Sequence, residues 1–112
     1  MPFFKIETNQ QLTDTENVIK NASRFVAELL NKPEQYVMIS VETGKKMMFG
    51  GSVAPTAFVR LKSIGLPVDK CALLSEKICR FVADELDVPP DRVFIDFADL
   101  KRNMFGWNGK TF

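Results

Sequence analysis

An internal repeat is the feature of this sequence that most constrains its fold. When the chain is shifted by 56 positions, so that Arg24 lies on Arg80, the stretch 24–39 matches the stretch 80–95 at eight positions. The identical residues include the run Arg-Phe-Val-Ala and a proline near the end of each stretch. So many matches at one constant offset indicate a tandem duplication, in which both halves of the chain fold into the same unit.

The first half has the pattern of a strand, a helix and a second strand. Residues 3–8 are a short apolar strand, and Thr13 and Glu16 have the spacing of a capping box at the start of a helix. Pro33 ends that helix, and residues 36–42 alternate as a strand with one buried face does. The helix carries apolar residues at helical spacing, namely Val18, Ile19, Ala22, Phe25, Val26, Leu29 and Leu30.

The second half repeats this order. Residues 57–63 are predicted to form a strand, Asp69 to cap the next helix, and Pro89 and Pro90 to end it. Residues 92–97 then form the last long strand. The apolar face of this second helix comprises Cys71, Leu74, Ile78, Phe81, Val82 and Leu86.

These units predict an α+β fold with two layers. The two strands of each unit should run parallel, because a helical crossover joins them. Two units side by side give a four-stranded sheet with both helices on one face. We expect a single domain over residues 1–112, with repeats at about 1–55 and 56–112. Ferredoxin-like folds have the same layers, so the pattern leaves the strand order open.

Self-association is expected from what this architecture leaves uncovered. A sheet with helices on one side has a second face and two edges that need partners. The tail over residues 103–112 is rich in aromatic residues but belongs to neither repeat, so it should dock against another surface. The number of subunits does not follow from these observations.

Composition and charge argue against several classes of function. The 15 Lys and Arg residues balance 14 Asp and Glu residues, and no basic stripe is present, which argues against binding nucleic acid or an anionic membrane. No apolar stretch approaches the ~20 residues of a membrane span. The N-terminus lacks the pattern of a signal peptide. A cytoplasmic protein is therefore expected.

The inventory of reactive side chains narrows the chemistry further. The sequence contains no His, which removes imidazole triads and most catalytic zinc sites, and no cluster with metal-ligand spacing is evident. Cys71 and Cys79 are eight residues apart in one predicted helix. At ~1.5 Å per residue they lie about 12 Å apart, beyond the ~7 Å that a disulfide allows between Cα atoms. Both are interpreted as packing residues.

Short motifs follow one another in a fixed order along the whole chain. They are Met1-Pro2 directly before a strand, then residues 31–36 (NKPEQY), 48–52 (MFGGS), 63–65 (SIG), 90–93 (PDRV) and 106–112 (GWNGKTF). In their order, their spacing and the two-fold repeat, these motifs resemble the macrophage migration inhibitory factor family of the tautomerase superfamily. The resemblance implies a homotrimer, in which three four-stranded sheets enclose a central channel and the active sites lie at subunit interfaces. Short C-terminal strands would pair with a neighbouring subunit.

The resemblance further implies that Pro2 is the catalytic base. Aminopeptidases remove an initiator Met when the next residue is small, and this leaves a secondary amine on Pro2. The pKa of an α-amino group, ordinarily near ~8, falls when burial or a nearby ammonium disfavours the cation. Such a base can abstract a proton next to a carbonyl. The implied reaction is keto–enol tautomerisation of a small aromatic α-keto acid or enol, such as phenylpyruvate or dopachrome, without any cofactor.

Substrate contacts follow from the same resemblance. Lys32 would hold the substrate carboxylate, and the backbone amide of Ile64, beside Ser63, would help to bind the substrate. Four aromatic residues would form walls that receive a phenyl ring, and each also fits an ordinary role in a core or an interface. They are Tyr36, Phe94, Trp107 and Phe112.

Two of these positions depart from the family pattern. Vertebrate members typically carry Tyr where this chain has Phe94, so a hydroxyl donor is missing. Asp96 replaces an Asn, and its charge would raise the pKa of the Pro2 amine or repel an anionic substrate. Both changes predict weaker activity on phenylpyruvate. Residues 56–59 (TAFV) stand in place of the CxxC motif of the vertebrate members, so no thiol–disulfide activity is expected.

Three alternatives stay open at this point. Vertebrate relatives act as cytokines through cell-surface receptors and are exported without a signal peptide, so a receptor-binding role is the first. A catalytically silent trimer, retained for partner interactions, is the second. The third is a different reaction on the same proline, such as hydration or dehalogenation. Relatives with those activities add Arg or Glu groups around the amine, and no such groups are recognisable in this sequence.

Overall fold

The two helices of the repeats are separated by the repeat offset seen in the sequence. The computed structural model describes all 112 residues. Helix α1 spans Thr15–Leu30 and helix α2 spans Cys71–Leu86, each with 16 residues and 56 positions apart (71 minus 15). The strands are β1 Phe3–Thr8, β2 Met38–Glu42, β3 Ala57–Ile64 and β4 Val93–Leu100, followed by a hairpin of β5 Gly106–Trp107 and β6 Lys110–Thr111.

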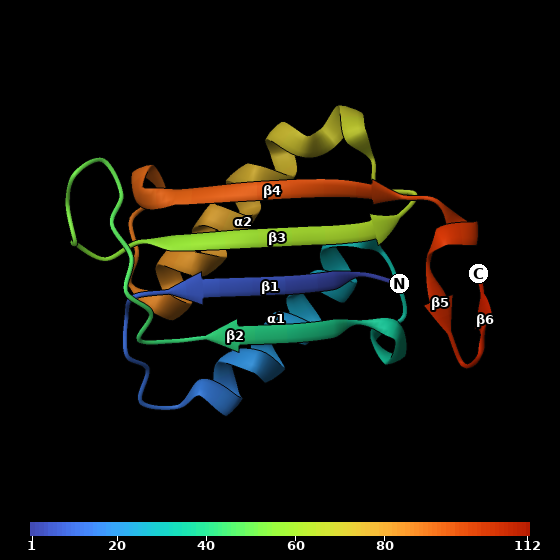
Figure 1. The fold of residues 1–112 in the computed structure, drawn as a ribbon, viewed down its shortest axis with the longest axis horizontal. Coiled ribbons are helices and arrows are strands. Elements are labelled where there is room, and N and C mark those ends of the chain that lie inside the picture. The colour runs from blue at the N-terminus through green and yellow to red at the C-terminus, as the bar shows by residue number, and fades with distance from the viewer.

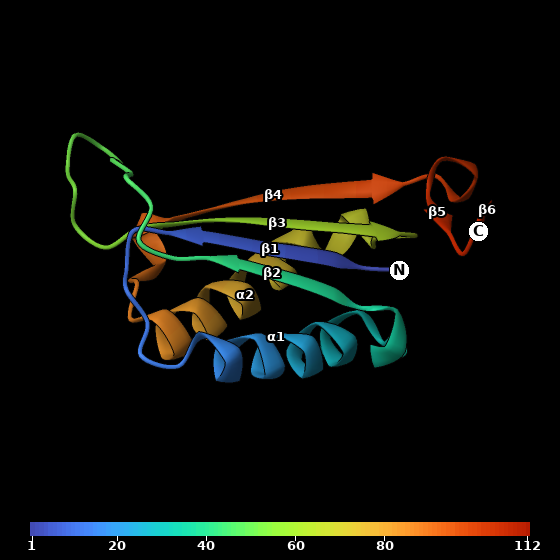
Figure 2. The ribbon, with the colours of Figure 1, turned by 60° about the horizontal axis from the view of Figure 1, so that its bottom comes forward.

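The main sheet has the strand order β2-β1-β3-β4. Strands β1 and β2 pair in parallel, as do β3 and β4, and the two units meet through the antiparallel pair of β1 and β3. Both helices cover the same face of the sheet, and the opposite face carries none (Figures 1 and 2). The predicted two-layer α+β fold is therefore confirmed, and the strand order that the sequence pattern left open is now defined.

The core lies between the sheet and the helices. Because side chains alternate along a strand, Phe4 and Ile6 of β1 point into the core and have no solvent exposure. Their neighbours Phe3 and Lys5 belong to the uncovered face and are only half-buried. Helix residues complete the core, among them Val26, Ile78 and Val82, all without exposure. The uncovered face thus carries the side chains that remain available to a ligand or a partner.

The helix starts differ from the predicted capping. The N-cap of α1 is Asp14, whose carboxylate accepts a hydrogen bond from the Asn17 amide at 3.1 Å, so the capping box based on Thr13 was wrong by one residue. Asp69 does not cap α2. It lies in a 3-10 turn over Val68–Lys70 that precedes the helix and moves its first residue to Cys71, with no side-chain cap.

Both helices end in the same way. Asn31 after α1 and Asp87 after α2 adopt left-handed backbone conformations, with φ of 52° and 57°. An Asn or Asp tolerates this conformation better than most residues and commonly terminates a helix. Pro33 and Pro89 each follow two positions later. The helices therefore stop shortly before the prolines that were predicted to end them.

Strand bounds also differ from expectation in places. Strand β2 begins at Met38 rather than at residue 36, because a 3-10 turn occupies Glu34–Tyr36. Strand β4 begins at Val93 and continues to Leu100, beyond the predicted end at residue 97. Cys71 and Cys79 are unpaired and half-buried on α2. None of the helices has the length and apolar character needed to cross a membrane.

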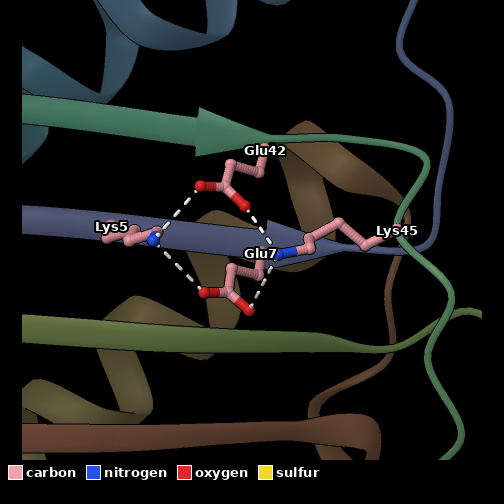
Figure 3. Close-up of polar contacts among 4 residues, drawn as sticks. All are labelled: Lys5, Glu7, Glu42 and Lys45. Carbon is pink, nitrogen blue, oxygen red and sulfur yellow. Dashed lines mark hydrogen bonds and ion pairs between the residues drawn. The ribbon is translucent and has the colours of Figure 1, made fainter.

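Four charged side chains form a closed network on the uncovered face. Lys5 makes ion pairs with Glu7 at 3.3 Å and with Glu42 at 3.2 Å. Lys45 makes ion pairs with the same two carboxylates, at 3.8 Å and 2.7 Å respectively (Figure 3). Each ammonium therefore has two carboxylates, and each carboxylate has two ammonium groups. The network covers the middle of the sheet and the end where β1 and β2 finish.

Candidate active site

A cavity of about 400 Å³ opens at the end of the sheet where β1 begins. The start of the chain, the segment from the first 3-10 turn into β2, strand β3 and the C-terminal tail all contribute to it. Figure 1 shows the N-terminus next to the β5–β6 hairpin at this end of the molecule. The lining residues are Met1, Pro2, Phe3, Gln35, Tyr36, Val37, Met38, Lys62, Phe105, Gly106, Trp107 and Phe112.

Aromatic rings from two segments form one wall of the cavity. Trp107 and Phe112 stack with ring centroids 5.8 Å apart, and Tyr36 meets Trp107 edge-on at 5.4 Å. Phe105, which the sequence reasoning did not include, stacks on Phe112 at 5.9 Å. The backbone amide of Phe112 also donates a hydrogen bond to the oxygen of Phe105 at 3.2 Å. The aromatic tail therefore docks, and three of the four predicted wall residues come together.

Pro2 occupies a buried position at the edge of this cavity. Its side chain is fully buried, and its carbonyl oxygen accepts a hydrogen bond from the Met38 amide at 3.0 Å, which fixes the start of β1 against β2. Burial lowers the pKa of the Met1 amine below its ordinary value of 8.0, and the nearby Lys32 ammonium lowers it further. The start of the chain is thus held where a cationic amine is disfavoured.

Lys32, Ser63 and Ile64 meet at one backbone oxygen. The Nζ atom of Lys32 and the hydroxyl of Ser63 each donate a hydrogen bond to the carbonyl of Ile64, both at 3.3 Å. Ser63 and Ile64 are buried at the end of β3. None of the three lines the cavity described above, although the Lys32 charge is close enough to influence the N-terminal amine. These predicted residues therefore lie behind the cavity rather than on its surface.

Phe94 and Asp96 lie outside the cavity of their own protomer. Phe94 is paired with Phe58 in the sheet, and its ring packs against Phe49 with centroids 4.6 Å apart. Asp96 is paired with Arg60. Because β1 and β3 are antiparallel, the Phe58 end of β3 lies beside the last residues of β1 and away from Pro2. One protomer therefore does not bring these two predicted site residues to the others.

Lys62 lines the cavity but was absent from the predicted site. It pairs in the sheet with Phe3, the residue after Pro2, so the two side chains share the uncovered face. The alternation of the strand over residues 57–63 was a sequence signal for this orientation. The sequence pattern did not reveal the antiparallel pairing of β1 and β3, which places Lys62 beside the start of the chain.

The comparisons with known proteins agree over the whole chain. The family model described as macrophage migration inhibitory factor (MIF) matches residues 1–112. A macrophage migration inhibitory factor homologue of Brugia malayi is 43% identical over 114 residues, covering 100% of this chain and 99% of the relative. A second homologue, from Trichuris trichiura, is 36% identical over 117 residues and covers 100% of both chains.

Solved structures give the same result. The homologue from Prochlorococcus marinus has a TM-score of 0.92 and 38% identity, with 98% of each chain covered. The factor from Trichinella spiralis has a TM-score of 0.92 and 34% identity, covering 98% of this chain and 99% of that one. The fold and these matches define a protein of the tautomerase superfamily. Within it, the chain belongs to the macrophage migration inhibitory factor family, whose members are typically homotrimeric.

Proposed function

We propose that this protein is a keto–enol tautomerase whose general base is the amine of Pro2 after removal of Met1. The observation that supports the proposal most is the position of Pro2, which is buried beside an aromatic cavity. The amine of the preceding residue, Met1, already feels the charge of Lys32. Removal of Met1 makes Pro2 the N-terminal residue, so the free amine then lies one residue further into this buried environment. Burial and the neighbouring ammonium both favour its neutral form, which is the form that accepts a proton.

The proposed substrate is a small aromatic α-keto acid or its enol. The stacked rings of Trp107 and Phe112, with Tyr36 edge-on to them, offer a surface for a phenyl group. Pro2 would remove a proton from the carbon next to the keto group and, once protonated, return a proton at the other site of the enolate. Lys32, as a positive charge behind the amine, would stabilise the negative charge that develops on the enolate oxygen. No cofactor is required for this proton transfer.

A second copy of the chain is proposed to complete the site. In one protomer the cavity is bordered by large apolar side chains that are well exposed, with Met38 at 65% and Trp107 at 47%. Phe94, exposed at 62%, lies on the edge strand at the other end of the sheet. A cyclic trimer would bring that end of one protomer to the Pro2 end of the next and cover both surfaces. Phe94 and Asp96 would then face the cavity of a neighbour.

The composition of that second surface supports a further candidate function. Phe94 has no hydroxyl to donate, and Asp96 adds a negative charge that would disfavour an anionic substrate near it. A trimer of this kind could serve mainly to bind a partner, as a cytokine-like protein does, with little catalysis. Partner binding would then survive substitution of Pro2, which catalysis would not.

Two measurements test the proposed activity. Intact mass determines whether Met1 is removed, since a retained Met1 turns the nitrogen of Pro2 into an amide without basicity. Turnover of enol-phenylpyruvate is then compared between the wild type and Pro2→Gly. We expect turnover by the wild type and a loss of at least about a hundredfold in the variant, the lower end of what general-base catalysis contributes. Equal rates would remove Pro2 from the mechanism.

A further inference from the structure

Lys62 is the one charged side chain among the residues that line the cavity. Its neighbours in the sheet are Phe3 on β1 and Ala98 on β4, so no carboxylate stands beside it in its own row. The side chain is half-buried, in contrast to most surface lysines. A cationic side chain thereby borders a space that is lined mostly by apolar and aromatic residues.

The other charges of the uncovered face do not compensate Lys62. Glu7 and Glu42 are each bound by both Lys5 and Lys45 (Figure 3). Asp96 is the strand neighbour of Arg60, one row away from Lys62, and makes no ion pair with Lys62. Within the protomer, Lys62 makes no ion pair and no side-chain hydrogen bond, whereas Lys5 on the same face makes ion pairs with two carboxylates. A half-buried ammonium without a partner binds an anion more readily than one already neutralised.

Lys32 does not fill the same role, because its ammonium is directed elsewhere. It follows the C-cap of α1 on the helical side of the sheet, and its Nζ atom donates a hydrogen bond to the carbonyl oxygen of Ile64. Lys62 approaches the start of β1 from the uncovered face of the sheet. The two lysines therefore lie on opposite sides of the sheet near the start of the chain, and only Lys62 lines the cavity.

We infer that Lys62 is a specificity-determining residue, which binds the acidic group of an aromatic ligand inside the cavity. The inference deepens the proposed function, on which it rests for taking this cavity as the substrate site. The ligand class that it selects is an aromatic carboxylate, with the ring against Trp107 and Phe112 and the carboxylate on the Nζ atom of Lys62. A charge-assisted hydrogen bond of this type favours the anion over a neutral analogue of the same shape.

The test uses the single tryptophan of the chain as the reporter. Trp107 lines the cavity, so its fluorescence follows occupancy without any turnover. The dissociation constants of 3-phenylpropanoate and of its neutral isostere 3-phenylpropanamide are measured for the wild type, Lys62→Met, Lys62→Arg and Lys46→Met. Lys46 is the matched control, since it is exposed, makes no ion pair and follows β2 at the opposite end of the sheet.

We expect the wild type and Lys46→Met to bind the carboxylate roughly tenfold or more tightly than the amide, as a hydrogen bond to a charged group allows. Lys62→Met should bind both ligands equally, and Lys62→Arg should restore the preference. Retention of the preference in Lys62→Met overturns the inference. A wild type without any preference for the carboxylate also overturns the inference. This result would be seen if Asp96 of a neighbouring protomer neutralised Lys62.

The outcomes also separate this inference from the proposed activity. If the wild type binds the carboxylate selectively through Lys62 but does not tautomerise enol-phenylpyruvate, the anion site is supported and the proposed function is wrong. If the wild type tautomerises through Pro2 and Lys62→Met keeps the preference for the carboxylate, the proposed function is supported and the anion site is wrong.

Discussion

The Nζ atom of Lys32 donates a hydrogen bond to the carbonyl oxygen of Ile64 at 3.3 Å, and this bond connects the two repeats at the candidate site. Lys32 follows the helix of the first repeat, and Ile64 ends the first strand of the second. The same ammonium lowers the pKa of the N-terminal amine through its charge. One side chain therefore supports the end of β3 and also affects the amine at the start of the chain, here that of Met1.

Removal of the Lys32 charge should shift the pH dependence of the reaction. In Lys32→Met the pKa of the Pro2 amine should rise, because the ammonium that disfavours the cation is gone. A larger fraction of the amine is then protonated at any pH near neutrality. The acidic limb of kcat/KM should move to higher pH, while Lys46→Met should leave it in place. If the acidic limb of Lys32→Met stays at the wild-type pH, Lys32 does not affect the pKa of the base.

Restoration of the family residues at the two departing positions should increase activity. If a neighbouring protomer presents Asp96 to the cavity, Asp96→Asn removes a charge that stabilises the protonated amine and repels an anionic substrate. Phe94→Tyr adds a hydroxyl that can donate to the enolate. We expect the double variant to gain roughly tenfold in kcat/KM for enol-phenylpyruvate, about the effect of one unit of pKa. An unchanged value would place both residues outside the site.

Most of the fold was predictable because the two signals that define it, apolar periodicity and the internal repeat, can be read directly from the sequence. Apolar periodicity identified both helices, and the repeat offset of 56 positions between α1 and α2 is the one seen in the sequence. The errors were at element ends. A 3-10 turn before α2 displaced its start from Asp69, and another delayed β2 to Met38. Such turns depend on contacts between the chain and the sheet, and apolar periodicity does not predict these contacts.

The candidate site was less predictable because it depends on pairing between distant strands. The family resemblance implied Trp107 and Phe112 as site residues, and the aromatic composition of the tail predicted that it docks; both rings do meet Tyr36. Lys62 was missed because only the register of β1 with β3 brings it beside the start of the chain. Phe94 and Asp96 came from a resemblance whose site spans two subunits. In one protomer, strand β4 holds both residues away from Pro2.

Arg92 should contribute strongly to stability through the loop that it holds. Its guanidinium donates to the carbonyl oxygens of Pro55 at 2.8 Å, Phe49 and Ser52 at 3.0 Å, and Ala54 at 3.1 Å. Arg92→Lys cannot reproduce this planar set of donors. The free energy of unfolding in urea should fall by about 2 kcal/mol, in the range of one lost hydrogen bond to a charged group.

Arg80→Lys provides the matched control for that measurement. Arg80 is exposed on α2, and its side chain makes one ion pair, with Glu76 at 3.4 Å. Its replacement should change the free energy of unfolding by less than about 0.5 kcal/mol, as surface substitutions usually do. Equal effects of the two substitutions would contradict the role assigned to Arg92.

The charged network of the uncovered face should make stability depend on acidic pH. Hydrogen bonds from Lys45 and then Lys5 hold the pKa of Glu42 below its ordinary value of 4.5. A carboxyl group with a depressed folded-state pKa stabilises the protein above 4.5 and loses that contribution as the pH falls through the folded value. The melting temperature of the wild type should therefore decrease below pH 4.5, and Glu42→Gln should show a smaller decrease. Because the network is exposed to solvent, 1 M salt should also reduce the difference between the two proteins at pH 7. If the melting temperatures of both proteins decrease by the same amount across this pH range, the ion pairs around Glu42 contribute nothing to stability.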